Sequence, residues 1–430
     1  MKILIKNAVC LDDCGNSSVK NVLVNDEVVE FVGDTLPADS ETADRVIDAA
    51  GCVLTPGFVN AHCHTPMSLL RGLGSDCPLD VWLNDHIFPA EDKLDGDLAK
   101  IGTLSAIAEM LAGGVTSFSD MYFFCDKIAD AVIETGIKAN ISRSVVSFDD
   151  SEDPASNFRV DETLDLFNNY HNAANGRVKV DFSLHAEYTN TERMTCYLAE
   201  LAGKYGARLH IHLSETEKEH REGIARRGMT PTAFFKKCGV FDVPVLAAHC
   251  VWLEDEDVAI MAEAGATAIH NPRSNLKLGS GIMDYAKLSA GGVNIALGTD
   301  GSASNNKQDL LSELQLAAIL HKGAMRDATA VPAAEALRAA TVGGAVAQGR
   351  DAFFCVTEGM KADLVLINCE RPGVSSEEDV VSSLVYSSDR SDVVLTMVDG
   401  RILFEKGEYN TIDIERLRHD FKAARSKLMS

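Results

Sequence analysis

The chain has 430 residues, 46% of them apolar and 24% charged, a composition typical of a globular protein with a large core. Its 64 acidic and 40 basic residues give a formal net charge of −24, which disfavours binding to the phosphates of nucleic acids. No apolar run approaches the ~20 residues that cross a bilayer, and the first residues do not resemble an export signal. With eleven cysteines in no secretory pattern, the sequence predicts a cytoplasmic protein without nucleic-acid or membrane partners.

Short strand-like runs separated by turns fill the beginning of the chain. The same texture returns near the other end, at residues 362–368 and 393–404. Two strand-rich ends can pair with each other while the central segment is inserted between them. We therefore expect a small β-sandwich domain built from residues 1–55 and 350–410.

The middle of the chain alternates between short runs rich in β-branched residues and stretches with a helical pattern. The expected strands are residues 53–60, 115–120, 138–145, 178–186, 208–213, 243–249, 266–270 and 293–297. Eight strand–helix alternations favour a closed parallel (β/α)8 barrel of the TIM type over an open sheet. The expected fold class is therefore α/β, with the barrel over residues 56–349 and a C-terminal helix within 411–430.

The clearest chemical signal is His62-Cys63-His64, directly after the first expected barrel strand. Residues two apart on an extended strand point to the same side, so both imidazoles can bind one metal ion. Two histidines at this spacing also occur by chance. Their placement at the C-terminal end of a barrel strand, where the active sites of such barrels gather, favours a functional role.

Three later strand ends repeat this placement with His212, His249 and Asp300. Each has a plainer interpretation, because a single histidine is more often a core residue and Asp300-Gly301 also fits a turn. Together with the first pair, however, they provide several nitrogen and oxygen ligands at one end of the barrel. Three or four such ligands with one open position are typical of a catalytic metal site.

Several runs resemble the motifs of the amidohydrolase superfamily. They are residues 56–64, 212–216, 248–253, 274–281 and 297–301. The most similar branch contains the 5′-methylthioadenosine/S-adenosylhomocysteine deaminases, with the triazine chlorohydrolases close to it. The resemblance implies a (β/α)8 barrel with a β-sandwich made from both chain ends, in agreement with the strand pattern.

The resemblance also implies a role for each residue of the metal site. The ligands of a single metal ion would be His62, His64, His212 and Asp300. The metal would most often be zinc, with Fe2+ or Mn2+ as alternatives. Glu215 would transfer a proton to the ring, His249 would hold the attacking water, and Asp300 would accept a proton from that water. Glu215 also fits a plainer role as a first-turn acid that stabilises the following helix.

Four further residues resemble substrate contacts of this branch. Trp82 would pack against a thioether tail, and Glu91 would accept hydrogen bonds from ribose hydroxyls. Arg143 would meet a homocysteine carboxylate, and His185 would contact the purine. Each also has a structural alternative: interface packing for Trp82, a solvated helix start for Glu91, a rim salt bridge for Arg143 and simple packing for His185.

Two positions depart from the pattern of the branch. Glu187 stands where a Pro-Tyr pair is common after the histidine, and Arg273 stands within Asn271–Asn275, where Cys-Pro-Thr-Ser-Asn is common. Both lie near strand ends, and they leave open which ring or tail is accepted.

The sequence thus predicts a metal-dependent aminohydrolase with a small-molecule substrate. The expected reaction converts an adenosine-like nucleoside, namely 5′-methylthioadenosine, S-adenosylhomocysteine or adenosine, to the inosine product and ammonia. The same site on guanine, a pterin or a chlorotriazine is the alternative, and a non-catalytic barrel scaffold is the third hypothesis. We also expect a homo-oligomer, either a dimer or a tetramer.

Overall fold

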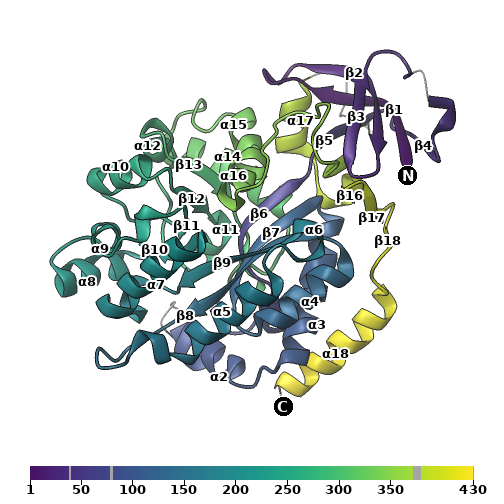
Figure 1. Cartoon of the computed structure of the whole chain (residues 1–430). Helices are drawn as coiled ribbons and strands as arrows, with labels where there is room; N and C mark the ends of the chain where they lie inside the picture. Colours follow the sequence, from purple (N-terminus) through teal and green to yellow (C-terminus); the bar gives the residue numbers. More distant parts are fainter. Residues whose placement is uncertain (38–39, 78–80, 371–378, 430) are drawn as a thin grey trace.

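A computed structural model describes residues 1–37, 40–77, 81–370 and 379–429 of the chain. Within them lie two nine-stranded sheets, one curled into a barrel and one formed by the chain ends (Figure 1). The predicted α/β fold with a TIM-type barrel is confirmed, and the chain ends, expected as a β-sandwich, form one additional sheet.

The barrel strands follow one another in chain order and pair in parallel. They are β6 (Phe58–His64), β7 (Val115–Tyr122), β8 (Lys138–Val145), β9 (Val178–Leu184), β10 (Leu209–Leu213), β11 (Val245–His249), β12 (Thr267–His270) and β13 (Asn294–Leu297). The ring closes through β14 (Asp300–Gly301), which pairs with β6, while β13 just before it pairs with β12. The eighth strand is thus interrupted after Leu297, and its second part closes the barrel.

These strands are buried on both faces, because the barrel interior lies on one side and a layer of helices on the other. Up to α17, the helices of eight or more residues are α3 (Gly96–Ala112), α4 (Cys125–Thr135), α5 (Phe158–Tyr170), α7 (Glu192–Tyr205), α8 (Glu217–Arg227), α10 (Asp255–Glu263), α14 (Leu310–Met325) and α17 (Val380–Ser387). Shorter ones are α2 (Phe88–Glu91), α6 (Ala173–Gly176), α9 (Pro231–Lys237), α11 (Pro272–Lys277), α12 (Tyr285–Ala290), α13 (Ser302–Asn305), α15 (Ala333–Arg338) and α16 (Gly344–Gln348).

The second sheet joins strands from both ends of the chain in the order β18-β17-β16-β15-β5-β1-β2-β3, with β4 paired to β1. Its strands are β1 (Lys2–Leu11), β2 (Ser17–Asn25), β3 (Val28–Gly33), β4 (Arg45–Asp48), β5 (Cys52–Pro56), β15 (Leu364–Asn368), β16 (Val393–Val398), β17 (Arg401–Glu405) and β18 (Glu408–Tyr409). Side chains from both ends, such as Ile5, Leu54, Leu366 and Met397, share one core. That the two segments form a domain of their own stays a prediction.

One expected element is wrong in its boundaries. The run 53–60, taken as one barrel strand, is divided: β5 pairs with β15 in the end sheet and β6 starts the barrel. The chain passes from one sheet to the other at Gly57, between β5 and β6. A Cβ atom at this position would lie 2.1 Å from Thr116 Oγ1, so the close approach to Thr116 requires glycine. An unbroken apolar run does not reveal that the chain changes sheets within it.

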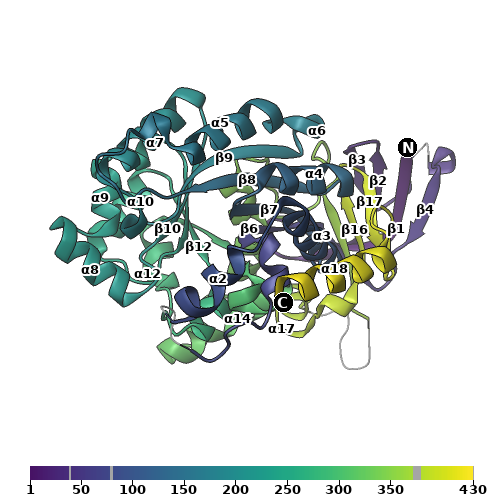
Figure 2. The ribbon, with the colours of Figure 1, turned by 90° about the horizontal axis from the view of Figure 1, so that it is seen from below.

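The chain ends in α18 (Ile414–Met429), which packs along α3 (Figure 2). Arg425 donates to the carbonyl of Arg71 at 2.7 Å, and Lys427 pairs with Asp95 at 2.8 Å. None of the helices in the described ranges is both long and apolar enough to cross a membrane.

Candidate active site

Five side chains meet at the C-terminal end of the barrel, and we call them the histidine–aspartate cluster: His62, His64, His212, His249 and Asp300. They come from β6, β10, β11 and β14. The ligand atoms of His62, His212 and His249 lie within 4.8 Å of one another, and so do those of His62, His64 and Asp300. The parallel strands of a barrel bring their ends together in this way although the residues are far apart in sequence.

Hydrogen bonds orient the rings of the cluster. The Nδ1 of His64 donates to the carbonyl of Met121 at 2.5 Å, and the Nδ1 of His212 donates to the carbonyl of His185 at 3.0 Å. Because a carbonyl only accepts, each Nδ1 must carry a proton, so in the neutral form of each ring the Nε2 has the lone pair that a metal ion needs. This arrangement is common for metal-binding histidines.

His62 and Asp300 complete the fit to a metal ion. The Nε2 of His62 is fully buried and has no hydrogen-bond partner among the described residues, although such atoms are rarely left unpaired. Asp300 Oδ1 lies 3.5 Å from this atom and 3.2 Å from His64 Nε2. Burial lowers the pKa of His62 to about 3, which keeps the ring neutral as a ligand must be.

The second oxygen of Asp300 is fixed by two hydroxyl groups, from Ser274 at 2.5 Å and Ser304 at 2.9 Å. The backbone of Asp300 is left-handed, with φ of 60°, and that of His249 is also left-handed, with φ of 74°. Such conformations cost energy for residues other than glycine and gather at functional sites. The fold therefore holds both side chains in place at some conformational cost.

Glu215 lies beside the cluster without belonging to either ligand set. Its Oε1 accepts from Ser280 Oγ at 3.1 Å, and its Oε2 lies 3.8 Å from His249 Nε2. The other ring nitrogen of His249 donates to Asn275 Oδ1 at 2.8 Å. Glu215 and the Nε2 of His249 thus face the same space next to the cluster.

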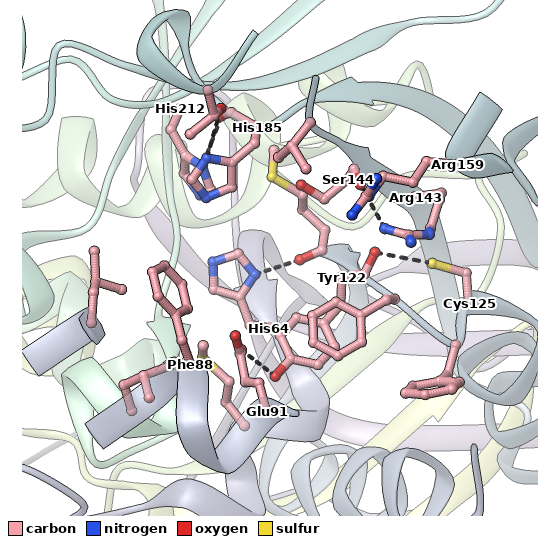
Figure 3. A pocket seen from close by; sticks show the side chains of 18 of the residues that line it. His64, Phe88, Glu91, Tyr122, Cys125, Arg143, Ser144, Arg159, His185 and His212 are labelled. Carbon is pink, nitrogen blue, oxygen red and sulfur yellow. Dashed lines mark hydrogen bonds between the residues drawn. The ribbon is translucent and has the colours of Figure 1, made fainter. Parts of the chain in front are cut away.

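That space is a cavity of about 990 Å3 that extends from the cluster to the protein surface. Its wall includes all four residues expected to bind substrate: Trp82, Glu91, Arg143 and His185. Figure 3 shows the last three around the cavity together with His64 and His212. A cavity of this size next to metal-type ligands is typical of an enzyme for small molecules.

Comparison with known proteins agrees with this geometry. Residues 53–403 match the model of the amidohydrolase family. A 5-methylthioadenosine/S-adenosylhomocysteine deaminase of Moorella thermoacetica is 41% identical over 97% of both chains. The chain belongs to the amidohydrolase family.

Solved structures are similar over nearly the whole amidohydrolase chain. An adenosine deaminase from Xanthomonas campestris with bound zinc has a TM-score of 0.92 and 32% identity, and the match covers 99% of this chain and 98% of that one. The atrazine chlorohydrolase of Arthrobacter aurescens TC1, complexed with zinc, has a TM-score of 0.89 and 26% identity, with 98% and 100% covered. The predicted family, including its likeness to triazine chlorohydrolases, is therefore confirmed.

In the outer cavity of this amidohydrolase, Glu91 is a half-buried carboxylate. Its Oε1 accepts a hydrogen bond of 2.5 Å from the hydroxyl of Tyr122, and burial raises its pKa to about 7. Trp82 begins the helical segment Trp82–Ile87, which leads into α2, and α2 ends at Glu91. Trp82 is buried, and its Nε1 donates to the carbonyl of Leu73 at 3.1 Å. Both side chains come from the segment that follows β6.

Arg143 lies on β8, and His185 follows the neighbouring strand β9; both side chains line the cavity. The Nε of Arg143 donates to Glu162 at 2.5 Å, so the salt bridge considered as its alternative role exists, although the guanidinium also lines the cavity. His185 follows β9, and its Nδ1 lies 3.1 Å from Thr189 Oγ1. Burial lowers the pKa of His185 to about 4, so the ring is neutral near pH 7.

Glu187 and Arg273, the two departures from the pattern of the branch, are held by ion pairs outside the cavity. The cavity wall, as far as the described residues form it, includes neither side chain. Glu187 is fully buried and pairs with Arg226 at 2.5 Å and Arg227 at 2.6 Å, while Arg273 pairs with Glu313 at 3.2 Å. A position just after a strand end does not fix the direction of a side chain, because the short helical turn there points it away.

Sequence reasoning missed several residues of the site. Tyr122, at the end of β7, and Ser280 bind the two glutamates Glu91 and Glu215. The position at a strand end was a usable signal for Tyr122, because the active sites of such barrels gather there. Ser280 lay in a recognised motif, but nothing in the sequence assigned it a partner.

Proposed function

We propose that this amidohydrolase removes the amino group of an adenosine-like nucleoside by zinc-assisted hydrolysis. The proposed substrates are 5′-methylthioadenosine, S-adenosylhomocysteine and adenosine, and the products are the corresponding inosine compound and ammonia. The observation that carries the proposal is Glu91, a half-buried carboxylate in the same cavity as the histidine–aspartate cluster. An acceptor of this kind suits the paired hydroxyls of a ribose, and the names of the similar deaminases agree with it.

The ligands that would hold one zinc ion are His62, His64, His212 and Asp300. Bound there, zinc would act as a Lewis acid that makes the attacking water more acidic. The unpaired Nε2 of His62 and the fixed Nδ1 protons of His64 and His212 support this assignment. Zinc in two similar solved structures supports the choice of metal.

The proton transfers would be divided between two carboxylates. Asp300 would take a proton from the water while the water oxygen bonds to the ring carbon that carries the amino group. Glu215 would protonate the adjacent ring nitrogen. The proton taken up by Asp300 would then pass to the amino group, which leaves as ammonia while the hydroxyl proton returns to Glu215 and the carbonyl forms. His249, held by Asn275, would orient the water from the opposite side.

The substrate would lie along the cavity with its ring at the cluster. We assign the purine contact to the neutral His185, the ribose hydroxyls to Glu91 and the 5′ tail to Trp82. Arg143 would bind the carboxylate of a homocysteine tail while Glu162 holds its Nε. Each of these four residues would thus contact a part of the nucleoside that matches its polarity.

Ammonia release from purified protein tests the proposal. The panel contains the three nucleosides, adenine, guanine, a pterin and a chlorotriazine. Turnover of at least one nucleoside above every free base and every triazine is the expected result. Faster turnover of guanine, a pterin or a triazine would overturn the substrate assignment, and no turnover of any compound by zinc-loaded protein would favour a scaffold.

Two further expectations stay predictions of this proposal. We propose a homo-oligomer, either a dimer or a tetramer, which light scattering on the purified protein measures directly. We also propose that the enzyme acts in the cytoplasm, where cell fractionation should recover it.

A further inference from the structure

The helix that follows Glu215 begins with an unusual cap. Thr216 is the N-cap of α8, and its Oγ1 accepts from the backbone N–H of Glu219 at 3.1 Å. A threonine followed three residues later by a glutamate normally forms a capping box, in which the glutamate accepts from the N–H of the cap itself. Here the Glu219 carboxylate reaches further back, so that Oε1 accepts from Ser214 N–H at 3.1 Å and Oε2 accepts from Glu215 N–H at 2.8 Å.

The two N–H groups belong to the turn that carries Glu215. Ser214 has a left-handed backbone, with φ of 47°, which is costly for a residue with a side chain. Its hydroxyl lies 3.2 Å from His220 Nδ1, one residue after Glu219. The side chain of Glu219 is buried, with 8% of the residue exposed, so little water competes for its oxygens. The first turn of α8 thus fixes the turn before it.

The other end of α8 is also anchored to the active-site cavity. Arg226 and Arg227, the last residues of the helix, both pair with the buried Glu187. Glu187 lies two residues after His185, which lines the cavity. The helix is therefore attached to two loops next to the cavity, by hydrogen bonds at its N-terminus and by two ion pairs to Glu187 at its C-terminus.

We propose that Glu219 is a positioning residue, which fixes the backbone of Ser214 and Glu215 so that the Glu215 carboxylate meets the substrate ring in the correct orientation. The inference rests on the proton-transfer role assigned to Glu215 in the proposed function. It gives a purpose to a buried carboxylate that lines the cavity but has no role as metal ligand, proton donor or substrate contact in the proposed function. A small displacement of a reacting group lowers the reaction rate by a large factor. We therefore expect the two hydrogen bonds between Glu219 and the backbone of Ser214 and Glu215, called the Glu219 brace below, to affect turnover.

Glu219→Gln tests this inference with almost no change of size. An amide has only one acceptor oxygen, so one of the two N–H groups loses its acceptor and faces an NH2 group instead. We expect kcat to fall about tenfold, the effect of one lost charge-assisted hydrogen bond, while KM changes less than about threefold. Zinc content should stay at the wild-type value, because Glu219 is not a proposed ligand.

Glu217→Gln is the matched control. Glu217 lies in the same helical turn, is exposed to solvent and pairs with Arg221. The control removes the same charge from the same helix and leaves the brace intact. Its kcat should equal that of the wild type, and a tenfold fall would show that charge on α8 matters rather than the brace.

A double-mutant cycle separates positioning from a general structural role. If Glu219 acts through Glu215, Glu219→Gln should have less than about a twofold effect on kcat in the Glu215→Gln background. The same tenfold loss in both backgrounds would overturn the inference, as would an unchanged kcat in the single variant. Rates are referred to folded, zinc-loaded protein, and thermal unfolding shows whether each variant is folded at the assay temperature.

Glu219→Asp keeps the measurement possible if the amide variant does not fold. Aspartate retains two acceptor oxygens but is shorter by one methylene group, and kcat should again fall with KM preserved. If Glu215→Gln alone leaves kcat unchanged, the proposed role of Glu215 fails first, and that result is distinct from a failure of the Glu219 brace.

Discussion

The active-site cavity has an inner part, the histidine–aspartate cluster, and an outer part, the wall with Trp82, Glu91 and Arg143. Different kinds of structure hold these two parts. The histidine–aspartate cluster comes from strand ends, and its rings are oriented by backbone carbonyls or by buried side chains such as Asn275. Trp82 and Glu91 come from the segment after β6, and Arg143 is held by a glutamate that is half exposed. The inner part follows from the barrel itself, so similar proteins can share it while their outer walls differ. We expect changes in the inner part to abolish turnover and changes in the outer part to alter substrate preference.

Metal removal is the strongest test of the inner part. Protein stripped by a chelator should lose turnover by about 10³-fold or more, since Lewis-acid activation of the water is worth several kcal/mol. Added zinc should restore the activity, and metal analysis of untreated protein should give about one ion per chain. A content near two ions would contradict the single-metal site, and full activity without metal would contradict the mechanism.

Glu215→Gln is expected to have the next largest effect. Loss of the proton donor should reduce kcat by roughly 10²- to 10⁴-fold. Zinc should stay bound, because the Glu215 carboxylate belongs to neither group of ligand atoms. Loss of the metal in this variant would show that Glu215 is a ligand, and the inner part would then need a different assignment.

Glu91→Ala examines the outer part. The variant removes the proposed acceptor of the ribose hydroxyls and leaves the cluster unchanged. We expect kcat/KM for nucleosides to fall by about 10- to 100-fold, the cost of one or two hydrogen bonds to a charged group. Any slow turnover of free adenine should be unchanged, and an equal loss for adenine would mean that Glu91 has a structural role.

The inner part of the cavity could be predicted from the sequence, whereas much of the outer part could not. The spacing of His62 and His64 placed both rings on one face, because the side-chain period of a strand is two. His212, His249 and Asp300 could be added because all barrel strands end at the same side. These inferences need only the periodicity of the chain and the topology of the fold, and the geometry of the cluster agrees with them.

Interactions between distant side chains could not be predicted in this way. Neither the pairing of Glu187 with Arg226 and Arg227 nor that of Arg143 with Glu162 has a sequence signal, since each joins separate elements. The passage of the chain at Gly57 from one sheet to the other was hidden because the strands on both sides are equally apolar. Side-chain direction in the turns after strands could not be predicted either.

Arg143→Ala should change kcat/KM according to the 5′ tail of the substrate rather than according to its ring. S-adenosylhomocysteine has a carboxylate that 5′-methylthioadenosine and adenosine lack. A charge-assisted hydrogen bond contributes roughly 1.5–3 kcal/mol, so kcat/KM for S-adenosylhomocysteine should fall about tenfold or more. The two other nucleosides serve as internal controls, and equal losses on all three would mean that Arg143 only forms the salt bridge with Glu162.

The smallest expected effect is a pH dependence of nucleoside binding that originates at Glu91. Burial raises the pKa of this carboxyl to about 7, so the group is mostly ionised at pH 8 and mostly protonated at pH 6.5. Only the ionised form accepts from both ribose hydroxyls, and the ionised fraction falls about fourfold between these two pH values. KM for a nucleoside should therefore rise about fourfold from pH 8 to pH 6.5 if KM follows binding. Glu91→Gln has no titrating group at this position, so its KM should be higher than that of the wild type and nearly constant over the same range. A KM that rises equally in both proteins would assign the titration to another group and would remove Glu91 from the ribose site.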